Sequence, residues 1–250
     1  MEPVLYAELD GVAHVTLNRP ERLNAINAAL ASSLADALRR AVGSTSAEVI
    51  VLSGAGRAFC AGDDLDEFSA GGVEAAGAEA FIADLQEATR LIMLGPKPVI
   101  CAVQGWVVGG GAAWPLNADF CLVAQDAVMF CPEASHGLFP TGGATVLLAE
   151  RAGQALANRI LWLGERLSAD QMVAAGIASA VVPAATLMDE ATALARRLMA
   201  LPAASRRRLK AARAADLADR LERAMALETR NCLEAAFDAE ARERVAATRS

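Results

Sequence analysis

The sequence contains 250 residues with a formal net charge of −7, and 54% of its residues are hydrophobic. A chain of this length and hydrophobicity can bury a substantial core, which excludes a disordered polypeptide. The acidic balance argues against nucleic acid or an anionic membrane surface as the main partner, so we expect a small-molecule partner.

The first elements in the chain are predicted to be a β-hairpin and a helix. Two β-rich runs, VLYAEL and VAHVTL, flank the dipeptide DG at 10–11, which is typical of two-residue hairpin turns. Asn27 then stands at the N-cap position of a segment in which Leu30, Leu34 and Leu38 repeat at helical spacing. The chain is therefore expected to begin with an antiparallel strand pair and an amphipathic helix.

The middle of the chain alternates apolar β-rich runs with glycine-bearing loops and helical segments. The runs AEVIVLSG, PVICAV and DFCLVA are predicted strands, and a long helical region ends near Leu94, before a Gly-Pro pair. Such alternation is typical of an α/β core with largely parallel strand pairing.

A segment without charged residues separates Lys97 from Asp119, and its length could span a bilayer. It contains prolines and four glycines, so we predict a buried strand, a glycine turn and a helix rather than a membrane span. Trp106 and Trp114 flank the glycines and are expected to pack in the core. The opening residues MEPVLYAELD lack the features of a signal peptide, so none is expected.

After Pro140 the pattern becomes mainly helical. Ser168 and Gln171 have the spacing of a capping box, and the short β run SAVVP follows. From Thr186 onward the chain is rich in alanine, arginine and glutamate and is predicted to be helical. We therefore expect a core over residues 1–190 and a helical region over 191–250 that packs on the core or on a neighbouring subunit.

Several chemistries lack their characteristic residues. The chain has two histidines, His14 and His136, with no pair at zinc-ligand spacing, so no metal site is expected. A Walker loop, a hydrolase nucleophile elbow and a complete dinucleotide fingerprint are also missing, so no redox or nucleotide cofactor is expected. The irregular cysteine spacing predicts reduced thiols in a cytoplasmic protein.

Two glycine-bearing loops are the remaining candidates for a functional site. GRAFCAGDDL (56–65) follows one predicted strand and VQGWVVGGG (103–111) follows another. The ends of adjacent parallel strands form ligand crevices, and each loop runs into a helical segment whose first N–H groups are unpaired. Two such donors can form an oxyanion hole, although both loops could also be simple strand-to-helix turns.

Five sequence motifs make the chain resemble the enoyl-CoA hydratase/isomerase, or crotonase, superfamily over about residues 4–185. They are NRPERLNAIN (18–27), SGAGRAFCAGDDLDEF (53–68), VQGWVVGGG (103–111), PEASHGLFPTGG (132–143) and LSADQMVAAGIASAVVP (167–183). The resemblance implies an α/β fold of the ClpP/crotonase type, a spiral of stacked ββα units with a C-terminal helical trimerisation region. It also implies homotrimers or dimers of trimers. Lys210 is similar to the lysine with which the family's C-terminal helical part begins.

The resemblance further implies an acyl-CoA substrate, with coenzyme A as part of the substrate and no separate cofactor. Its thioester oxygen would accept hydrogen bonds from the backbone N–H groups of Asp63 and Gly110. Glu133, in the family's Pro-Glu motif, would be the catalytic residue. A glutamate beside apolar residues can have a pKa raised towards the working range of a general base.

The same resemblance assigns four residues to binding of coenzyme A. Arg22 and Leu23 occupy the contact positions of the family's CoA-binding loop, whereas Asp64 and Leu65 lie where the family holds the nucleotide end. For Arg22, a solvated surface arginine remains an alternative.

The chain departs from the family's pattern at two catalytic positions. The second glutamate of typical hydratases is replaced by Ala113, and the aspartate of some isomerases by Thr141. Glu133 is thus the only carboxylate at an expected catalytic position, with Thr141 and His136 as possible auxiliary groups. One base suffices for migration of a double bond, so isomerisation is favoured and hydration stays open.

Asp63 is a further departure, because small or apolar residues are usual at that position. Its side chain could point to solvent; near the thioester it would oppose enolate formation unless protonated. Two other hypotheses remain open. The chain could be a divergent superfamily member, such as a lyase, decarboxylase or dehalogenase, or an acyl-CoA-binding homologue without catalytic activity.

Overall fold

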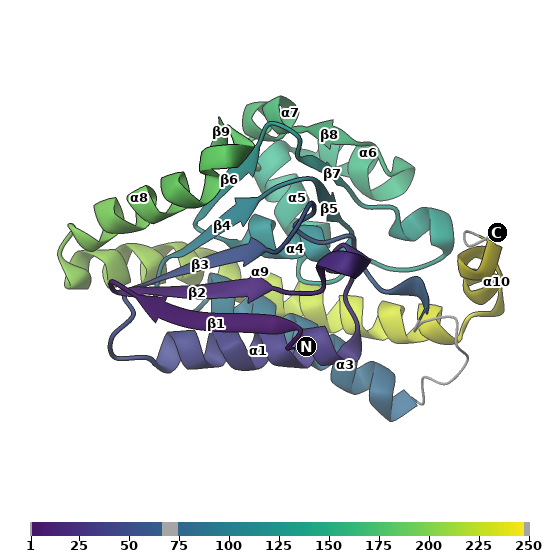
Figure 1. Ribbon diagram of the computed structural model, residues 1–250. Helices are drawn as coiled ribbons and strands as arrows, with labels where there is room; N and C mark the ends of the chain where they lie inside the picture. Colours follow the sequence, from purple (N-terminus) through teal and green to yellow (C-terminus); the bar gives the residue numbers. More distant parts are fainter. Residues whose placement is uncertain (1, 67–74, 248–250) are drawn as a thin grey trace.

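A six-stranded sheet forms the centre of the computed structural model, which describes residues 2–66 and 75–247 (Figure 1). The strand order is β1-β2-β3-β4-β6-β9; β1 and β2 pair antiparallel and the other neighbours pair parallel, as predicted for the core. The strands are β1 (Val4–Leu9), β2 (Val12–Leu17), β3 (Val49–Gly54), β4 (Val99–Val103), β6 (Phe120–Ala124) and β9 (Ala180–Val182). The end of the 53–68 motif and the start of the helical region before Leu94 lie outside the described residues.

Local sequence signals correctly locate the first hairpin and helix. Asp10 and Gly11 adopt positive φ angles of 49° and 81° in the turn between β1 and β2. The Asn27 side chain accepts a hydrogen bond from the Leu30 N–H at 3.0 Å and caps α1 (Ala28–Gly43). The predicted leucine stripe of α1 is buried against the sheet.

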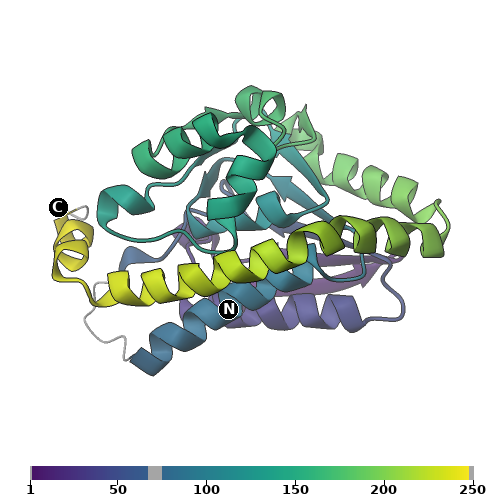
Figure 2. The same cartoon turned by 180° about the vertical axis from the view of Figure 1, so that it is seen from behind.

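Helices cover both faces of the large sheet. α1 and α3 (Ala75–Met93) contribute to the larger core cluster, whereas α8 (Leu187–Met199) packs its buried residues on the opposite face. The long helix α9 (Ala203–Phe237) crosses the back of the molecule beside α3 (Figure 2). There Gln86 Nε2 donates to the Met225 carbonyl at 2.8 Å and Arg90 pairs with Glu222. The C-terminal segment is thus packed on the core.

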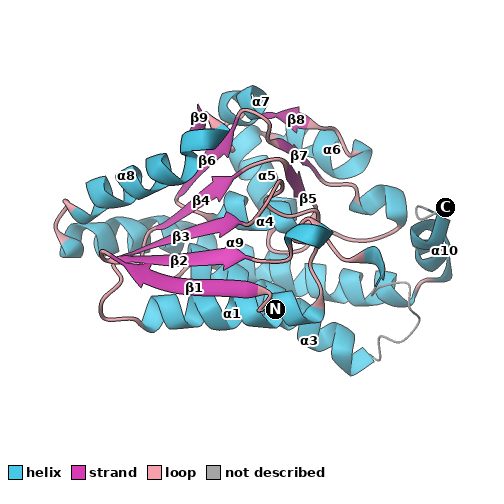
Figure 3. Cartoon of the chain, in the orientation of Figure 1, coloured by secondary structure: helices cyan, strands magenta, loops and turns pink. Residues whose placement is uncertain are grey.

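A second, three-stranded sheet was not expected from the sequence. It comprises β5 (Trp106–Val108), β7 (Val128–Phe130) and β8 (Leu167–Ser168), all three too short for a periodic pattern (Figure 3). Trp106 on β5 is 37% exposed and lies against Phe130 and Arg166, so its predicted core position is wrong. Trp114 is buried against Phe59, as expected.

The charge-free segment folds as the predicted strand, turn and helix. β4 leads through β5 and Gly109 into α4 (Gly110–Asn117), whose eight residues are all buried. Within residues 2–66 and 75–247, no helix is both long and apolar enough to cross a membrane. The missing charges therefore reflect burial inside the protein.

The second half of the chain is mainly helical. Ser168 and Gln171 form the predicted capping box. The remaining elements are η1 (Pro20–Arg22), η2 (Glu133–His136), α5 (Ala144–Ala152), α6 (Gln154–Leu163), α7 (Ala169–Ala174), η3 (Ala184–Thr186) and α10 (Ala239–Ala247). Residue 190, the predicted end of the core, lies within α8; the division into two regions stays a prediction.

Lys210 connects α9 to the sheet. Its buried ammonium group donates to the Ile92 carbonyl at 2.6 Å and to Asp119 Oδ2 at 2.5 Å. Burial lowers the pKa of Lys210, whereas the Asp119 carboxylate opposes that shift. Within one chain, this lysine therefore has a structural role at the beginning of the C-terminal helix.

Candidate active site

The two predicted loops meet beside β5. Cys60 N–H donates to the Trp106 carbonyl at 3.0 Å, and Val108 N–H donates to the Cys60 carbonyl at 2.9 Å. On the other side of the first loop, Asp64 N–H donates to the Ile26 carbonyl at 2.8 Å. These contacts hold the 56–65 loop between two segments and bring it against the triplet of glycines.

The two N–H groups assigned by the resemblance are available to a ligand. Asp63 forms a parallel bridge with Ile26 that uses the Gly62 carbonyl and the Asp64 N–H, which leaves the Asp63 N–H on the opposite side. Gly110 is the first residue of α4, where N–H groups lack intrahelical acceptors. In the described part of the chain neither N–H has a hydrogen-bond partner. Such donors can stabilise a negatively charged oxygen.

Gly109 creates the space beside these donors. Its φ of 54° and ψ of −127° are readily adopted only by glycine. A Cβ atom at this position would lie 2.8 Å from Glu133 Oε1. The glycine thus allows the carboxyl group to approach the backbone immediately before Gly110.

Glu133 is positioned by the short helix η2, which follows β7. The residue is 7% exposed, and its Oε2 atom has no hydrogen-bond partner within the described residues. Burial is the main cause that raises its pKa from 4.5 to about 7, and the negative charges of Asp63 and Glu228 raise it further. A carboxyl group with this pKa can both take and release a proton near neutral pH.

Burial of this carboxyl should make stability depend on pH. The folded protein binds the Glu133 proton more tightly than the unfolded chain, so this stabilisation is complete below about pH 4.5 and is lost as pH rises through about 7. Glu133→Gln does not titrate and is expected to gain about 1–3 kcal/mol relative to wild type over that range. Urea unfolding at several pH values measures the difference; a difference independent of pH would contradict the prediction.

The Asp63 side chain does not point to solvent, so that alternative is wrong. Its Oδ1 atom is buried and has no hydrogen-bond partner among the residues described. Oδ1 lies 3.4 Å from the position that a Cβ atom of Gly110 would occupy. Burial raises the pKa of Asp63 from 3.8 to about 6. The loop therefore contributes a carboxyl group to the site as well as an N–H donor.

Of the two auxiliary candidates, Thr141 joins the site. Thr141 Oγ1 is 3.5 Å from the same Cβ position of Gly110. His136 Nδ1 instead lies 3.1 Å from the Pro132 carbonyl and 3.3 Å from Ser135 Oγ, within its own short helix. Ala113, which stands where typical hydratases have their second glutamate, is buried and packs against Gly142. Position 113 therefore provides no carboxylate.

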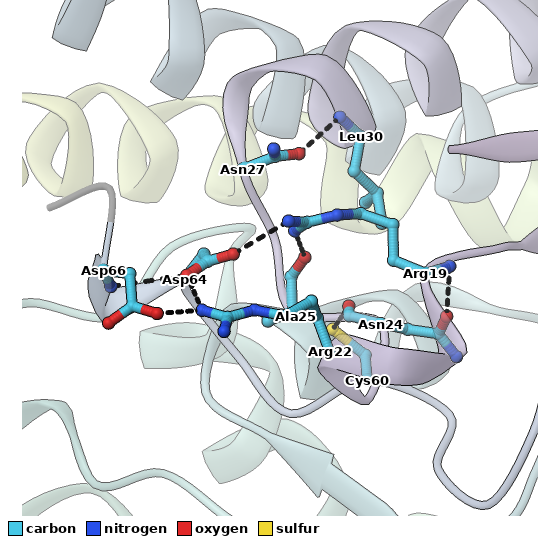
Figure 4. Close-up of polar contacts among 9 residues, drawn as sticks. All are labelled: Arg19, Arg22, Asn24, Ala25, Asn27, Leu30, Cys60, Asp64 and Asp66. Carbon is cyan, nitrogen blue, oxygen red and sulfur yellow. Dashed lines mark hydrogen bonds and ion pairs between the residues drawn. The ribbon is translucent and has the colours of Figure 1, made fainter. Parts of the chain in front are cut away.

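Two of the CoA-binding candidates, Arg22 and Asp64, belong to an ion-pair cluster with Arg19 and Asp66 (Figure 4). Asp64, with 4% of its side chain exposed, accepts hydrogen bonds from Arg19 and Arg22 at 3.0 Å each. Arg22 also pairs with Asp66 and is 44% exposed. The two arginines lower the pKa of Asp64 although burial raises it. Asp64 thus holds Arg22 at the surface, so the exposed arginine is anchored and not freely solvated.

Leu23 and Leu65 are half-buried beside this cluster. Leu23 has a left-handed φ of 53°, and its carbonyl accepts from the Ala61 N–H at 3.0 Å. The structure therefore places all four CoA-binding candidates on one pair of neighbouring segments. Their contact with coenzyme A stays a prediction.

Asn24 is a positioning residue that the sequence reasoning missed. It is fully buried, its Nδ2 donates to the carbonyls of Ala55 and Ala58 at 2.9 and 2.8 Å, and its Oδ1 accepts from the Arg19 N–H at 2.8 Å. The two bonds from Nδ2 connect the 19–24 segment to the start of the first loop, and the bond to Oδ1 closes the turn within 19–24. The only local signal was an asparagine, a residue that tolerates the left-handed φ of 56° observed here.

Asn24→Ala is expected to reduce the free energy of unfolding by about 2–4 kcal/mol, because it leaves buried carbonyl and N–H groups unpaired. Urea unfolding monitored by circular dichroism measures the change. Asn158→Ala, on the exposed surface of α6, is the matched control and should stay within about 0.5 kcal/mol of wild type. A loss below about 1 kcal/mol for Asn24→Ala would contradict this role.

A metal centre has no support in the described ranges 2–66 and 75–247, where no group of histidine, cysteine, aspartate and glutamate side chains could hold an ion.

Comparisons with known proteins identify the family and the fold. Residues 7–247 match the family model described as enoyl-CoA hydratase/isomerase. The chain is 39% identical over 207 residues to a 1,2-epoxyphenylacetyl-CoA isomerase of Escherichia coli strain K12, covering 81% of this chain and 78% of that protein. It is 35% identical over 245 residues to a probable enoyl-CoA hydratase of Rhodobacter capsulatus, covering 98% and 93% of the two chains. A crystal structure of an enoyl-CoA hydratase from Mycobacterium avium subsp. paratuberculosis superimposes with a TM-score of 0.89 at 29% identity, covering 99% of this chain and 95% of the other.

Proposed function

Because the chain belongs to the enoyl-CoA hydratase/isomerase family and has the crotonase fold, we propose that it is an enoyl-CoA isomerase that moves a carbon–carbon double bond along an acyl chain. Glu133 is the base, and the N–H groups of Asp63 and Gly110 hold the thioester oxygen. The observation that carries this proposal is the approach of the buried Glu133 carboxyl to the backbone of Gly109, next to one of the two free donors.

The chemistry follows from these groups. A proton on the α-carbon of a thioester becomes removable when the negative charge that develops on the thioester oxygen is stabilised. Two preorganised N–H donors supply that stabilisation, at about 3–4 kcal/mol for each donor. A carboxyl group with a pKa of about 7 can then remove the proton and return it.

Binding of the CoA part is assigned to the ion-pair cluster. The anchored Arg22 offers a positive charge to phosphate. Leu23 lies next to it in the chain, and Asp64 and Leu65 lie on the neighbouring 56–65 loop. Coenzyme A is part of the substrate, so the reaction needs no separate cofactor. We also propose a cytoplasmic homotrimer or dimer of trimers, on the family resemblance.

Hydration of a 2-enoyl-CoA is the second candidate function. The probable hydratase of Rhodobacter capsulatus matches almost the whole chain. The Asp63 carboxyl also gives the site a second acid–base group, which orientation of a water molecule requires. A pair of carboxyl groups is thus available, although neither lies at position 113.

The two reactions are separated by incubating the enzyme with 3-enoyl-CoA and 2-enoyl-CoA thioesters, resolving the products from the substrates by liquid chromatography and determining their masses by mass spectrometry. Isomerisation gives a product of unchanged mass, whereas hydration adds the mass of water. We expect the 3-enoyl substrate to be converted faster. Failure to convert either substrate, together with failure to exchange the α-hydrogen of a saturated acyl-CoA, would contradict the proposed function.

A further inference from the structure

Within the described residues, the Oδ1 atom of Asp63 has no hydrogen-bond partner. Glu133 Oε2 also lacks a partner within the described residues and is assigned to the reaction above, whereas two other buried carboxylates are held by the fold: Asp64 by two arginines, and Glu228 by Thr145 and the Gly143 N–H. Asp63 Oδ1, by contrast, is buried and unpaired among the described residues. Burying such a group is unfavourable, so an unpaired carboxyl indicates that a partner arrives with the substrate.

The direction of the Asp63 side chain places it beside the reacting part of the substrate. Its Oδ1 atom and Thr141 Oγ1 lie 3.4 and 3.5 Å from one point, the missing Cβ of Gly110. Glu133 Oε1 lies 2.8 Å from the corresponding point on Gly109, the preceding residue. A thioester oxygen bound to the Gly110 N–H therefore brings the first carbons of the acyl chain between the two carboxyl groups.

We propose that the Asp63 side chain is the second proton-transfer group of this site and delivers a proton to the γ-carbon after Glu133 has removed one from the α-carbon. The inference rests on the proposed function, because it assigns a further catalytic residue to the same reaction. The α- and γ-carbons are two bonds apart, so two fixed carboxyl groups can serve them without either having to move.

The atoms and electrons balance in this step. The Glu133 carboxylate takes the α-proton, the C–H electron pair forms the α,β double bond, and the β,γ double bond takes up the proton of Asp63 at the γ-carbon. During the transfer the two N–H groups hold the negative charge on the thioester oxygen. Glu133 ends protonated and Asp63 ionised, and transfer of one proton between them through solvent restores the starting state.

The charges around the two groups favour sharing of a single proton. Glu133 has a pKa of about 7 and Asp63 of about 6, and the charge of Asp63 raises the pKa of Glu133. Because both pKa values are raised and the two groups interact, a proton bound at this site belongs to the pair, and the reactive arrangement has it on Asp63. Among the described residues, the other titratable groups coupled to this pair are Glu228, Cys60, Cys131 and Cys232.

The test uses Asp63→Asn, which keeps the shape of the side chain and removes its titratable proton. Asp126→Asn, in the exposed turn after β6, is the matched control. Turnover of a 3-enoyl-CoA by Asp63→Asn is expected to fall by about 100-fold, within the range typical of losing a general acid. Exchange of the α-hydrogen of a saturated acyl-CoA, which needs only Glu133 and the two N–H groups, is expected to persist.

The isotope content of the product provides a second readout, which a purely structural role would not change. In a single turnover in heavy water, wild type is expected to place solvent deuterium at the γ-carbon. The residual product of Asp63→Asn should instead carry the substrate's own α-hydrogen there, returned by Glu133. Two results would overturn the role of Asp63 but leave the proposed function standing. One is wild-type product that carries mainly the substrate's own hydrogen at the γ-carbon. The other is turnover of Asp63→Asn within about threefold of wild type. Loss of α-exchange in Asp63→Asn would do the same, whereas loss of exchange in wild type would overturn the proposed function itself.

Discussion

Glu133→Gln is expected to lower turnover of enoyl-CoA by about 10²–10⁴-fold, the range found when a general base is removed. The amide has nearly the same shape but cannot take a proton from the α-carbon. Oε2 has no hydrogen-bond partner within the described residues, and the amide oxygen of glutamine can still accept the hydrogen bond that the carboxylate receives from its own backbone N–H. The loss should therefore appear in kcat, with little change in the Kd for a saturated acyl-CoA.

Stopped-flow or coupled assays of turnover and titration calorimetry of a saturated acyl-CoA together test this expectation. Glu190→Gln, on the exposed face of α8, is the control for loss of one negative charge and should keep wild-type activity. Turnover of Glu133→Gln within about tenfold of wild type would show that another group is the base. A parallel loss of binding would indicate that the residue shapes the pocket.

Gly110→Ala is expected to reduce turnover by about 10²–10³-fold, comparable to loss of one oxyanion-hole donor. The added methyl group would lie 3.3 Å from Ile26 Cδ1, 3.4 Å from Asp63 Oδ1 and 3.5 Å from Thr141 Oγ1. These contacts are with the ends of side chains, so the fold can accept the methyl group. The methyl group nevertheless occupies the space in which the thioester must approach the N–H.

Gly111→Ala is the comparison variant that distinguishes a loss of turnover from a loss of folding stability. Its Cβ atom would lie 2.5 Å from Cys60 Sγ and 2.6 Å from Cys60 Cβ, inside the packed core. It is expected to reduce the free energy of unfolding by about 1–3 kcal/mol, whereas Gly110→Ala should change it by less than about 1 kcal/mol. Thermal unfolding and turnover of both variants check this; full activity of a folded Gly110→Ala would remove Gly110 from the site.

The chain's elements were predictable where the determining interaction is local. The turn at 10–11, the Asn27 cap and the Ser168 capping box each depend on atoms only a few residues apart, and all three form as predicted. The strands of β5, β7 and β8 were missed because two or three residues are too few to show a period of two. Their pairing depends on partners more than 20 residues away.

Only those site residues that belong to the five family motifs could be predicted from the sequence. The order of the five motifs by itself determined the family and, through it, the proposed roles of Glu133, Gly110 and the backbone of Asp63. Sequence could not decide where the Asp63 side chain points, because Ile26 on one side and Gly110 on the other set its direction. It also could not locate Glu228 or Asn24, whose partners lie far away along the chain.

The sequence alone therefore determined that one glutamate stands at an expected catalytic position while Ala113 and Thr141 leave two others without a carboxylate. Only the tertiary structure decided that Asp63 directs a second carboxyl group, with its Oδ1 atom buried, into the same site. The physical reason is that burial and proximity, which set the direction and the pKa of a side chain, come from residues brought together by folding and not from neighbours in sequence.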